Sequence, residues 1–206
     1  MPDLSLDGNV QVQKYEVNWH ESMQQTYEFY VVDPSTWKDV KLLNEVESCT
    51  ITRDASVQTL GSASFDVGES LDECYVRVYL VVIQNGFTSK FPLGTYLLQT
   101  PAAEFDGKQK KYSIDAYTPL MELKESYPPI GYSVQKGTQI MPLACNVFRE
   151  HMRAPIISAK NEEKLYSNFV ANLDDTWLSF LSDFVASAKY QIKLDELGQV
   201  IFEPVV

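Results

Sequence analysis

Short strand-like segments separated by turn residues fill the chain between residues 46 and 118. In one of them, Gly61, Ala63, Phe65 and Val67 alternate with more polar residues. Alternation with a period of two is typical of a strand with one buried face, so these four residues are predicted to face the core. Short strands that recur at this spacing favour a closed or nearly closed β-barrel.

Turn residues indicate where the strands meet. Asn85-Gly86 is the strongest hairpin signal in the chain, between an apolar segment from Tyr75 to Ile83 and a return strand that begins at Phe87. Asp106-Gly107 predicts a second hairpin. Pro92 cannot donate to a strand ladder, so Pro92-Leu93-Gly94 predicts a bulge or an edge.

Two further strands are predicted ahead of this region, over residues 10–19 and 26–33. The first segment alternates apolar and polar residues in its first part, and the second is rich in β-branched and aromatic residues. Asp33-Pro34-Ser35 ends the second. Residues 35–43 are expected to form a loop. Trp37 in that loop either reaches a neighbouring subunit or packs into the core of its own chain.

The sequence changes character after Pro128-Pro129. Residues 139–152 and 175–188 carry apolar side chains at a helical period, with predicted N-terminal caps at Thr138 and at Asp174 or Asp175. Residues 190–203 then predict a hairpin. The fold class is therefore mainly β with a smaller α+β part: a β-barrel domain over residues 1–128 and a small two-helix plus β-hairpin domain over 129–206.

Charge and hydropathy exclude several classes of function. The formal net charge is −11, which disfavours a nucleic-acid-binding protein and a partner for anionic membranes. The N-terminus lacks the pattern of a signal peptide, and the apolar run Tyr79–Ile83 is too short to span a bilayer. We therefore expect a protein that is made in the cytoplasm and has no membrane partner.

No constellation of catalytic residues can be read from the chain. The two histidines, His20 and His151, lie in no metal-ligand pattern, and the three cysteines are widely spaced with no CxxC pair. Cys145 falls on the apolar face of a predicted helix, which favours a core position over a nucleophile. We expect no catalytic residue, no metal site and no cofactor, which points to a structural protein and not an enzyme.

Several stretches, in this order, resemble the hub proteins of phage tail tips and baseplates. That family shares a barrel with tail-tube proteins and with the spike-base proteins of type VI secretion. The stretches are Cys49–Asp54 with Leu60–Val67 and Tyr75–Tyr79, Pro92–Pro101, Tyr112–Leu123, Tyr132–Thr138, Trp177–Leu181 and Gly198–Pro204. No single motif is diagnostic; the resemblance rests on their order over residues 45–204.

The resemblance implies a ring of identical subunits, a homotrimer, that joins the tail tube or a distal tail protein to a central spike or tip protein. DNA would pass through the ring only as transient cargo, and the protein would reside in the virion. The strands 75–83 and 95–100 would form barrel edges between subunits. The implied interface residues are Trp37, Tyr75, Arg77, Tyr79, Tyr96 and Leu98.

Hub proteins are usually longer, with a second barrel, whereas this chain ends at Val206. A hexamer therefore stays open beside the trimer, and so does a generic small barrel with a helical appendix. Two other functions also stay open: a receptor- or glycan-binding tail module, which would expose aromatic side chains along a cleft, and a peptidoglycan hydrolase accessory domain.

Overall fold

The computed structural model describes residues 16–68, 71–99, 102–105 and 110–205. Their contacts divide the chain into two compact units. The first comprises residues 1–50 and 63–116, and the second comprises 51–62 and 117–206. The domain boundary after residue 128 stays a prediction.

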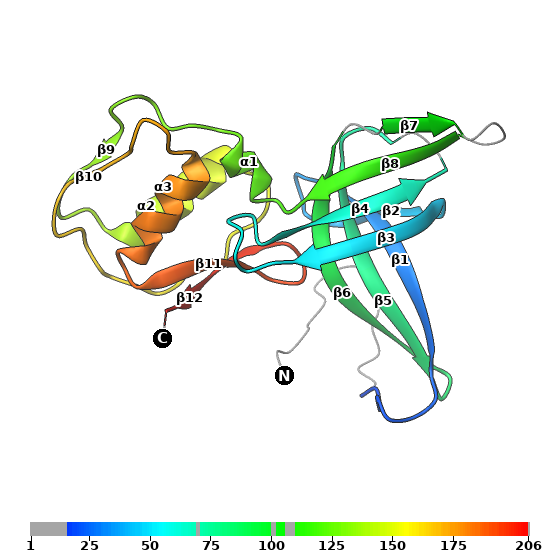
Figure 1. Ribbon diagram of the computed structural model, residues 1–206. Coiled ribbons are helices and arrows are strands. Elements are labelled where there is room, and N and C mark those ends of the chain that lie inside the picture. The colour runs from blue at the N-terminus through cyan, green and yellow to red at the C-terminus, as the bar shows by residue number, and fades with distance from the viewer. Residues whose placement is uncertain (1–15, 69–70, 100–101, 106–109, 206) are drawn as a thin grey trace. The chain divides into compact units, whose positions relative to one another are not determined.

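An eight-stranded sheet forms the first unit (Figure 1). The strands follow one another in the order β2-β1-β5-β6-β8-β4-β3, and β7 pairs with β8 beside this path. Their bounds are β1 Gln24–Val32, β2 Asp39–Leu43, β3 Val46–Arg53, β4 Gly61–Val67, β5 Tyr75–Gln84, β6 Phe87–Leu98, β7 Ala102–Phe105 and β8 Lys110–Tyr117.

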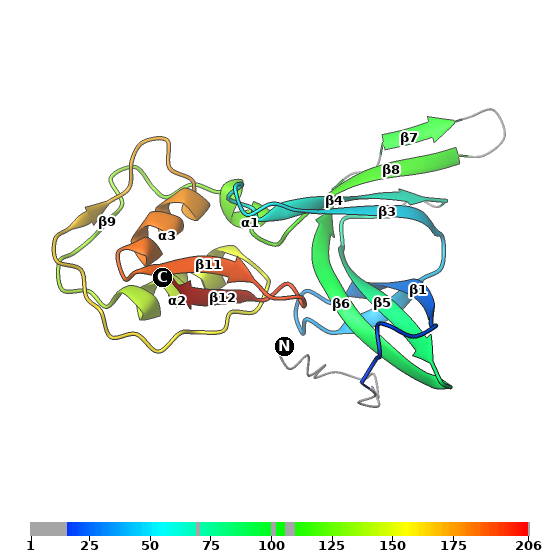
Figure 2. The ribbon, with the colours of Figure 1, turned by 60° about the horizontal axis from the view of Figure 1, so that its bottom comes forward.

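The sheet curves until its two ends come back together. β2 and β3 stand at opposite ends of the strand order, yet only Asn44 and Glu45 separate them in the chain. Figure 2 shows the result as two layers, with β1, β5 and β6 in one and β3, β4 and β8 in the other. Phe29 of β1 meets Phe65 of β4 edge-on between the layers, with ring centroids 6.1 Å apart. β2 and β3 do not pair in the described part of the chain, so a closed barrel is not confirmed.

The core face of β4 is the one that alternation predicts. Gly61, Ala63, Phe65 and Val67 are all buried, and the residues between them are half-buried. The alternation of apolar and polar residues therefore predicted the buried face of β4 correctly.

The β5–β6 hairpin also confirms its sequence signals. Asn85 and Gly86 have φ values of 51° and 79°, as a tight hairpin turn requires. The register shifts between Val78 and Tyr79, which pair with Gly94 and Pro92, so Leu93 has no opposite residue. This is the predicted bulge at Pro92–Gly94.

Two expectations near the N-terminus are wrong. Residues 16–23 form no strand, and the rest of the predicted strand, 10–15, lies outside the described residues. Residues 39–43, expected to lie in a loop, form strand β2 and pair with β1. The predicted turn at Asp106-Gly107 also lies outside the described residues, although β7 and β8 on either side of it do pair.

Three helices and two small antiparallel strand pairs make up most of the second unit. The elements are α1 Met121–Lys124, β9 Ser133–Val134, α2 Ile140–His151, β10 Phe169–Val170, α3 Trp177–Ala186, β11 Tyr190–Leu194 and β12 Val200–Pro204. α2 and α3 bury their apolar faces, including Phe148 and Phe184, as their helical periods predict. β11 and β12 form the predicted hairpin.

The helix caps differ from those expected. Thr176 caps α3 in a reciprocal pair with Ser179, while Asp175 accepts from the Ser179 hydroxyl. α2 begins after Gln139, whose side chain makes no cap hydrogen bond. Thr and Asp are both favoured N-caps, so the sequence could not separate Thr176 from Asp174 and Asp175 at the start of α3.

Candidate assembly surfaces

All six predicted interface residues are buried within the first unit. These are Trp37, Tyr75, Arg77, Tyr79, Tyr96 and Leu98. Their side chains pack against their own chain, and their role at a subunit interface stays a prediction. The expectation that residues 75–83 and 95–100 form barrel edges is wrong for the strands described: β5 pairs with β1 and β6, and β6 pairs with β5 and β8.

Trp37 packs into the core of its own chain. The turn after β1 holds it there: the Trp37 amide donates to the carbonyl oxygen of Asp33 at 2.7 Å, and Trp37 has a φ of 57°. The indole meets Tyr75 edge-on, with centroids 4.9 Å apart. Hydrogen bonds from the Ser35 amide and hydroxyl, and from Thr36, lower the pKa of Asp33 and keep its carboxylate charged. The second of the two alternatives for Trp37 is therefore the observed one.

A polar network centred on Arg77 joins β5 to β2 and β6. Arg77 Nη1 donates to Asp39 Oδ1 at 2.8 Å, and Nε donates to Thr95 Oγ1 at 2.9 Å. Nη2 donates to the carbonyl oxygen of Trp37. Tyr79 donates its hydroxyl to the other Asp39 oxygen. Burial and this bond to Asp39 raise the pKa of Tyr79, so the phenol stays protonated.

A second cluster lies beside the first on the same face of the sheet. Lys90 Nζ bonds the Glu28 carboxylate and lies over the Tyr30 ring, and Tyr30 meets Tyr79 edge-on. Desolvation opposes the charge of Lys90, but its bonds to Glu28 and Tyr30 outweigh that effect and raise its pKa. Both clusters hold strands in place, and neither presents a free nucleophile or base.

The outer edge of β2 is exposed and partly apolar. β2 pairs only with β1 among the described strands. Val40 and Leu42 keep 62% and 40% of their surface exposed, and Lys38 and Lys41 beside them are exposed as well. These four residues are called the β2 surface. Sequence analysis missed strand β2, because five residues that follow a proline-containing turn carry little strand signal.

A second exposed apolar surface lies at the far end of β1, β5 and β6. Figures 1 and 2 show this three-stranded end extending past β3, β4 and β8. Trp19, Tyr27 and Phe87 keep 48%, 59% and 43% of their surface exposed. Together with the exposed Glu16 and Glu21 they are called the ribbon surface.

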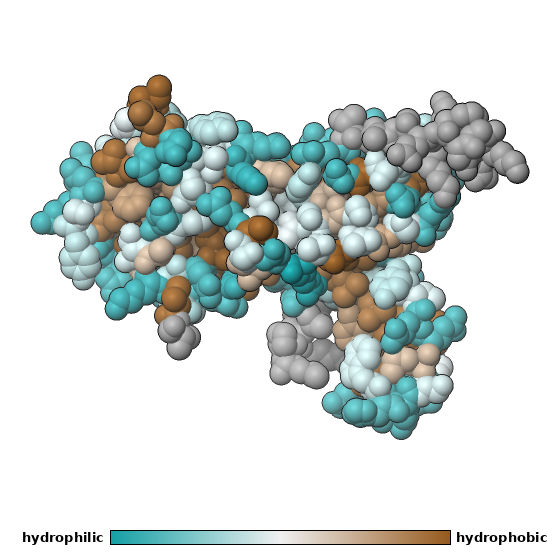
Figure 3. Space-filling model, viewed as in Figure 1, coloured by the Kyte–Doolittle hydropathy of each residue, from teal (hydrophilic) through white to brown (hydrophobic). Residues whose placement is uncertain are grey.

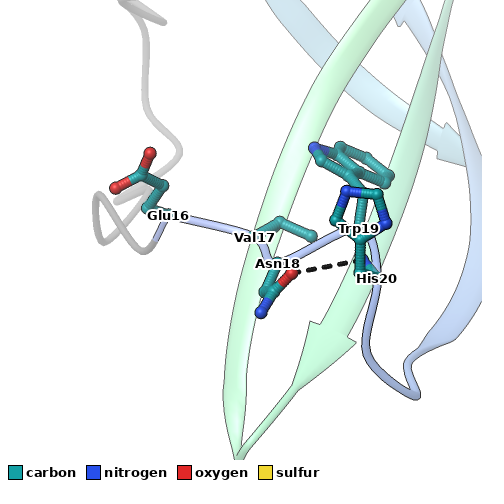
Figure 4. A pocket seen from close by; sticks show the side chains of 5 residues that line it. All are labelled: Glu16, Val17, Asn18, Trp19 and His20. Atoms are coloured by element: carbon teal, nitrogen blue, oxygen red, sulfur yellow. Dashed lines mark hydrogen bonds between the residues drawn. The ribbon is translucent and has the colours of Figure 1, made fainter.

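Residues 16–20 hold Trp19 in place on this ribbon. The Asn18 amide donates to Gln84 Oε1, and Gln84 Nε2 donates to the Asn18 carbonyl, both at 2.9 Å. Trp19 then contacts Phe91 with centroids 5.5 Å apart. A shallow pocket lies along this segment, lined by Glu16, Val17, Asn18, Trp19 and His20 (Figure 4).

The second unit has an apolar protrusion of its own. Ile130 and Leu173 are 93% and 88% exposed. The antiparallel register of β9 and β10 pairs Val134 with Phe169, and Ile130 and Leu173 lie in turns just outside these two strands. Figure 3 shows hydrophobic residues protruding over the loops that flank these strands.

Neither histidine lies in a catalytic arrangement among the described residues. His151 stacks on Trp177 with centroids 4.6 Å apart, and His20 is exposed beside Trp19. The described residues contain no group of three or more His, Cys, Asp or Glu side chains that could hold a metal ion. Within the same residues, no helix has the length and apolarity to cross a membrane.

Comparison with solved structures identifies the fold. The 43 kDa tail protein of prophage MuSo2 from Shewanella oneidensis superposes with a TM-score of 0.63 at 10% identity, over 89% of this chain. The tail protein from Neisseria meningitidis MC58 superposes with a TM-score of 0.64 at 13% identity, over 86% of this chain. This chain has the fold of phage tail proteins.

The tail-protein fold is reached without detectable sequence relationship. No family model and no curated protein sequence matches the chain. The chain spans about half the length of the two tail proteins, 56% of one and 51% of the other. The resemblance stated from the sequence is therefore confirmed at the level of fold.

Proposed function

We propose that this chain is a structural component of a phage tail tip or baseplate hub. In this proposal identical copies form a ring, a homotrimer, that joins the tail tube or a distal tail protein to a central spike or tip protein. The ring forms part of the conduit through which DNA passes, and the protein resides in the virion. It carries no catalytic activity.

One observation carries the proposal: a curved sheet of the tail-protein fold has two strands, β2 and β3, that pair on one side only in the described part of the chain. Unpaired strand edges are sites for pairing with another chain, and soluble proteins normally cover or blunt them. β2 also carries exposed Val40 and Leu42. Assembly into a ring would cover these edges, and the net charge of −11 would disfavour retention of passing DNA.

Light scattering coupled to size-exclusion chromatography tests the ring. The purified chain at micromolar concentration is expected to elute as a trimer, with a hexamer as the alternative closed ring. A stable monomer across this range would contradict the proposal. Antibody labelling of intact particles should in addition mark the tail tip, and labelling of the head or tail shaft would contradict that placement.

A second candidate function is a receptor- or glycan-binding tail module. The half-exposed Trp19 beside the pocket at residues 16–20 favours it, because aromatic faces stack on sugar rings. A glycan array probed with the purified chain separates the two candidates. Saturable binding that is lost in Trp19→Ala, by a monomer, would favour the module over the ring.

A further inference from the structure

β3 has a long edge that pairs with no strand in the described part of the chain. It has eight residues, Val46–Arg53, and among the described strands it pairs with β4 alone. It contains no proline and no lysine, and its β-branched residues Thr50, Ile51 and Thr52 favour an extended backbone. An edge of this kind pairs readily with a further strand.

β2, at the other end of the sheet, is less suited to accept a strand. It has only five residues, and its register with β1 shifts between Val31 and Val32. Lys38 before it and Lys41 within it are exposed. A short strand, a bulge and exposed lysines each hinder pairing at an edge, so β3 is the better acceptor of the two.

The two faces of β3 differ in burial. The Ser48 hydroxyl donates to Asp66 Oδ2 on β4 at 2.6 Å, and Asp66 lies on the face opposite the buried Phe65. Cys49 and Ile51 therefore face the core, where both are half-buried, while the residues between and beside them are exposed. A strand added at this edge should alternate apolar and polar residues, so that its apolar side chains cover Cys49 and Ile51.

Residues 10–15 have this alternation. Val10 and Val12 alternate with Gln11 and Gln13, and the stretch is the part of the first predicted strand that lies outside the described residues. The stretch ends directly before Glu16, where the description of the chain begins. Its sequence matches what the β3 edge requires.

The position of Glu16 decides which copy of β3 this stretch can reach. The segment that begins at Glu16 is held at the far end of β5 and β6, where Asn18 and Gln84 exchange two hydrogen bonds. Figures 1 and 2 both show this end extending past β3, β4 and β8. Three residues span at most about 10 Å, so Gln13 stays within that distance of Glu16. This favours the β3 of a second copy over the β3 of the same chain.

We propose that residues 10–15 of one copy add as a strand to the β3 edge of the next copy. This inference rests on the proposed ring and names one contact that closes it. The donor stretch and the acceptor edge are different parts of one chain, so repetition of the contact closes a ring when the rotation between copies allows it. Backbone hydrogen bonds supply the affinity, and Val10 and Val12 cover Cys49 and Ile51.

Disulfide cross-linking through Cys49 tests the contact and its face. Opposite residues of neighbouring strands have Cα atoms about 4.5 to 5.5 Å apart, which suits a disulfide. The even-numbered variants are Val10→Cys, Val12→Cys and Lys14→Cys, and the odd-numbered variants are Gln11→Cys and Gln13→Cys. Under mild oxidation one even-numbered variant should link to Cys49 of a second copy and give covalent oligomers on a denaturing gel. The odd-numbered variants should not link to Cys49, and peptide mass mapping identifies each linked pair.

A second acceptor position should reverse this pattern. In the background Cys49→Ser/Thr50→Cys the acceptor thiol lies on the exposed face of β3. An odd-numbered variant should now link and the even-numbered variants should not, and this thiol reacts even where burial slows Cys49. Ser158→Cys, at an exposed serine of the second unit, is the matched control and should link to neither acceptor.

Proline substitution tests the backbone pairing. Successive residues of a strand point their N–H groups to opposite sides, so one of Val12→Pro and Gln13→Pro removes a donor to β3. That variant should weaken self-association about tenfold or more, measured by light scattering over a concentration series. Ser5→Pro, outside the alternating stretch, should assemble like the wild type. Circular dichroism and thermal unfolding of each variant separate loss of assembly from loss of folding.

The outcomes separate this contact from the ring itself. If the wild type forms a ring but the cross-links follow neither pattern, or both proline variants assemble fully, this contact is wrong and the proposed ring stands. Links confined to single chains would show that the stretch pairs with its own β3, and would overturn the contact between copies. If the wild type is a monomer, both proposals fail.

Discussion

Arg77 Nη1 donates to Asp39 Oδ1 across 2.8 Å, with only 5% and 14% of the two side chains exposed. This ion pair ties the central strand β5 to β2, the strand at one end of the sheet. A strand that pairs on one side only is easily detached, so the pair fixes the position of the proposed assembly edge.

Arg77→Met is expected to destabilise the protein by about 3 kcal/mol, because it leaves the Asp39 carboxylate buried without its cation. Urea unfolding followed by circular dichroism measures the loss. Arg77→Met/Asp39→Asn should lose much less than the single variant, since the unpaired charge is gone. Equal losses in both would show that the ion pair is not the cause.

Trp37→Ala should destabilise by about 3 kcal/mol, because the buried indole fills the space beside Tyr75. Trp19→Ala is the matched control, as its indole is half exposed. Trp19→Ala should lower the free energy of unfolding by about 1 kcal/mol or less. Thermal unfolding of the two variants measures the fall in each midpoint. A larger fall for Trp19→Ala than for Trp37→Ala would contradict the placement of Trp37.

Gly61→Ala should be the most damaging glycine substitution in the sheet. Gly61 has a φ of 135°, and a Cβ there would overlap the carbonyl oxygen of Thr52. Gly86→Ala is the control, with a φ of 79° and no neighbouring atom within 4 Å. Gly86→Ala should cost about 1 kcal/mol from backbone strain alone, and Gly61→Ala should cost more. Soluble yield and unfolding midpoints of the two variants decide this.

Cys49 should react slowly with iodoacetamide in the folded protein at pH 8. Burial raises the pKa of the Cys49 thiol to about 11, so little thiolate is present. The rate should rise with pH up to about 11, and peptide mass mapping separates Cys49 from Cys74, whose pKa is also raised by burial and by Asp72 and Glu73. The same thiol in urea is the control and should react faster at pH 8.

The raised pKa of Cys49 also makes the stability of the folded protein depend on pH. The folded pKa of Cys49 lies above its unfolded value near 9. Its contribution to stability is therefore complete below pH 9 and is lost as the pH rises towards 11. Cys49→Ser should lose less stability than the wild type over that interval, and an identical pH profile in the two proteins would contradict the shift.

The hairpin, the bulge and the buried face of β4 could be predicted because each depends on local residues. Asn85-Gly86 sets a turn, Pro92 removes a ladder donor, and the alternation around Phe65 sets a face. These signals act within a few residues, so no knowledge of distant contacts was needed.

The assembly surfaces could not be predicted, because burial depends on what covers each strand. Tyr75 and Tyr79 look like edge aromatics in sequence, yet β1 and β6 flank them and Trp37 and Asp39 cover them. Tyr27 belongs to an equally aromatic strand but is exposed. Tertiary context decided each case.

The link of Asn44 and Glu45 limits what can enter between the two ends of the sheet. From Leu43 to Val46 the chain can extend at most about 10 Å. Neighbouring strands lie about 4.8 Å apart, so a strand inserted between β2 and β3 requires two such spacings, close to the full reach of the link. Close to the link, the two ends of the sheet therefore cannot be further apart than the width of one strand between them.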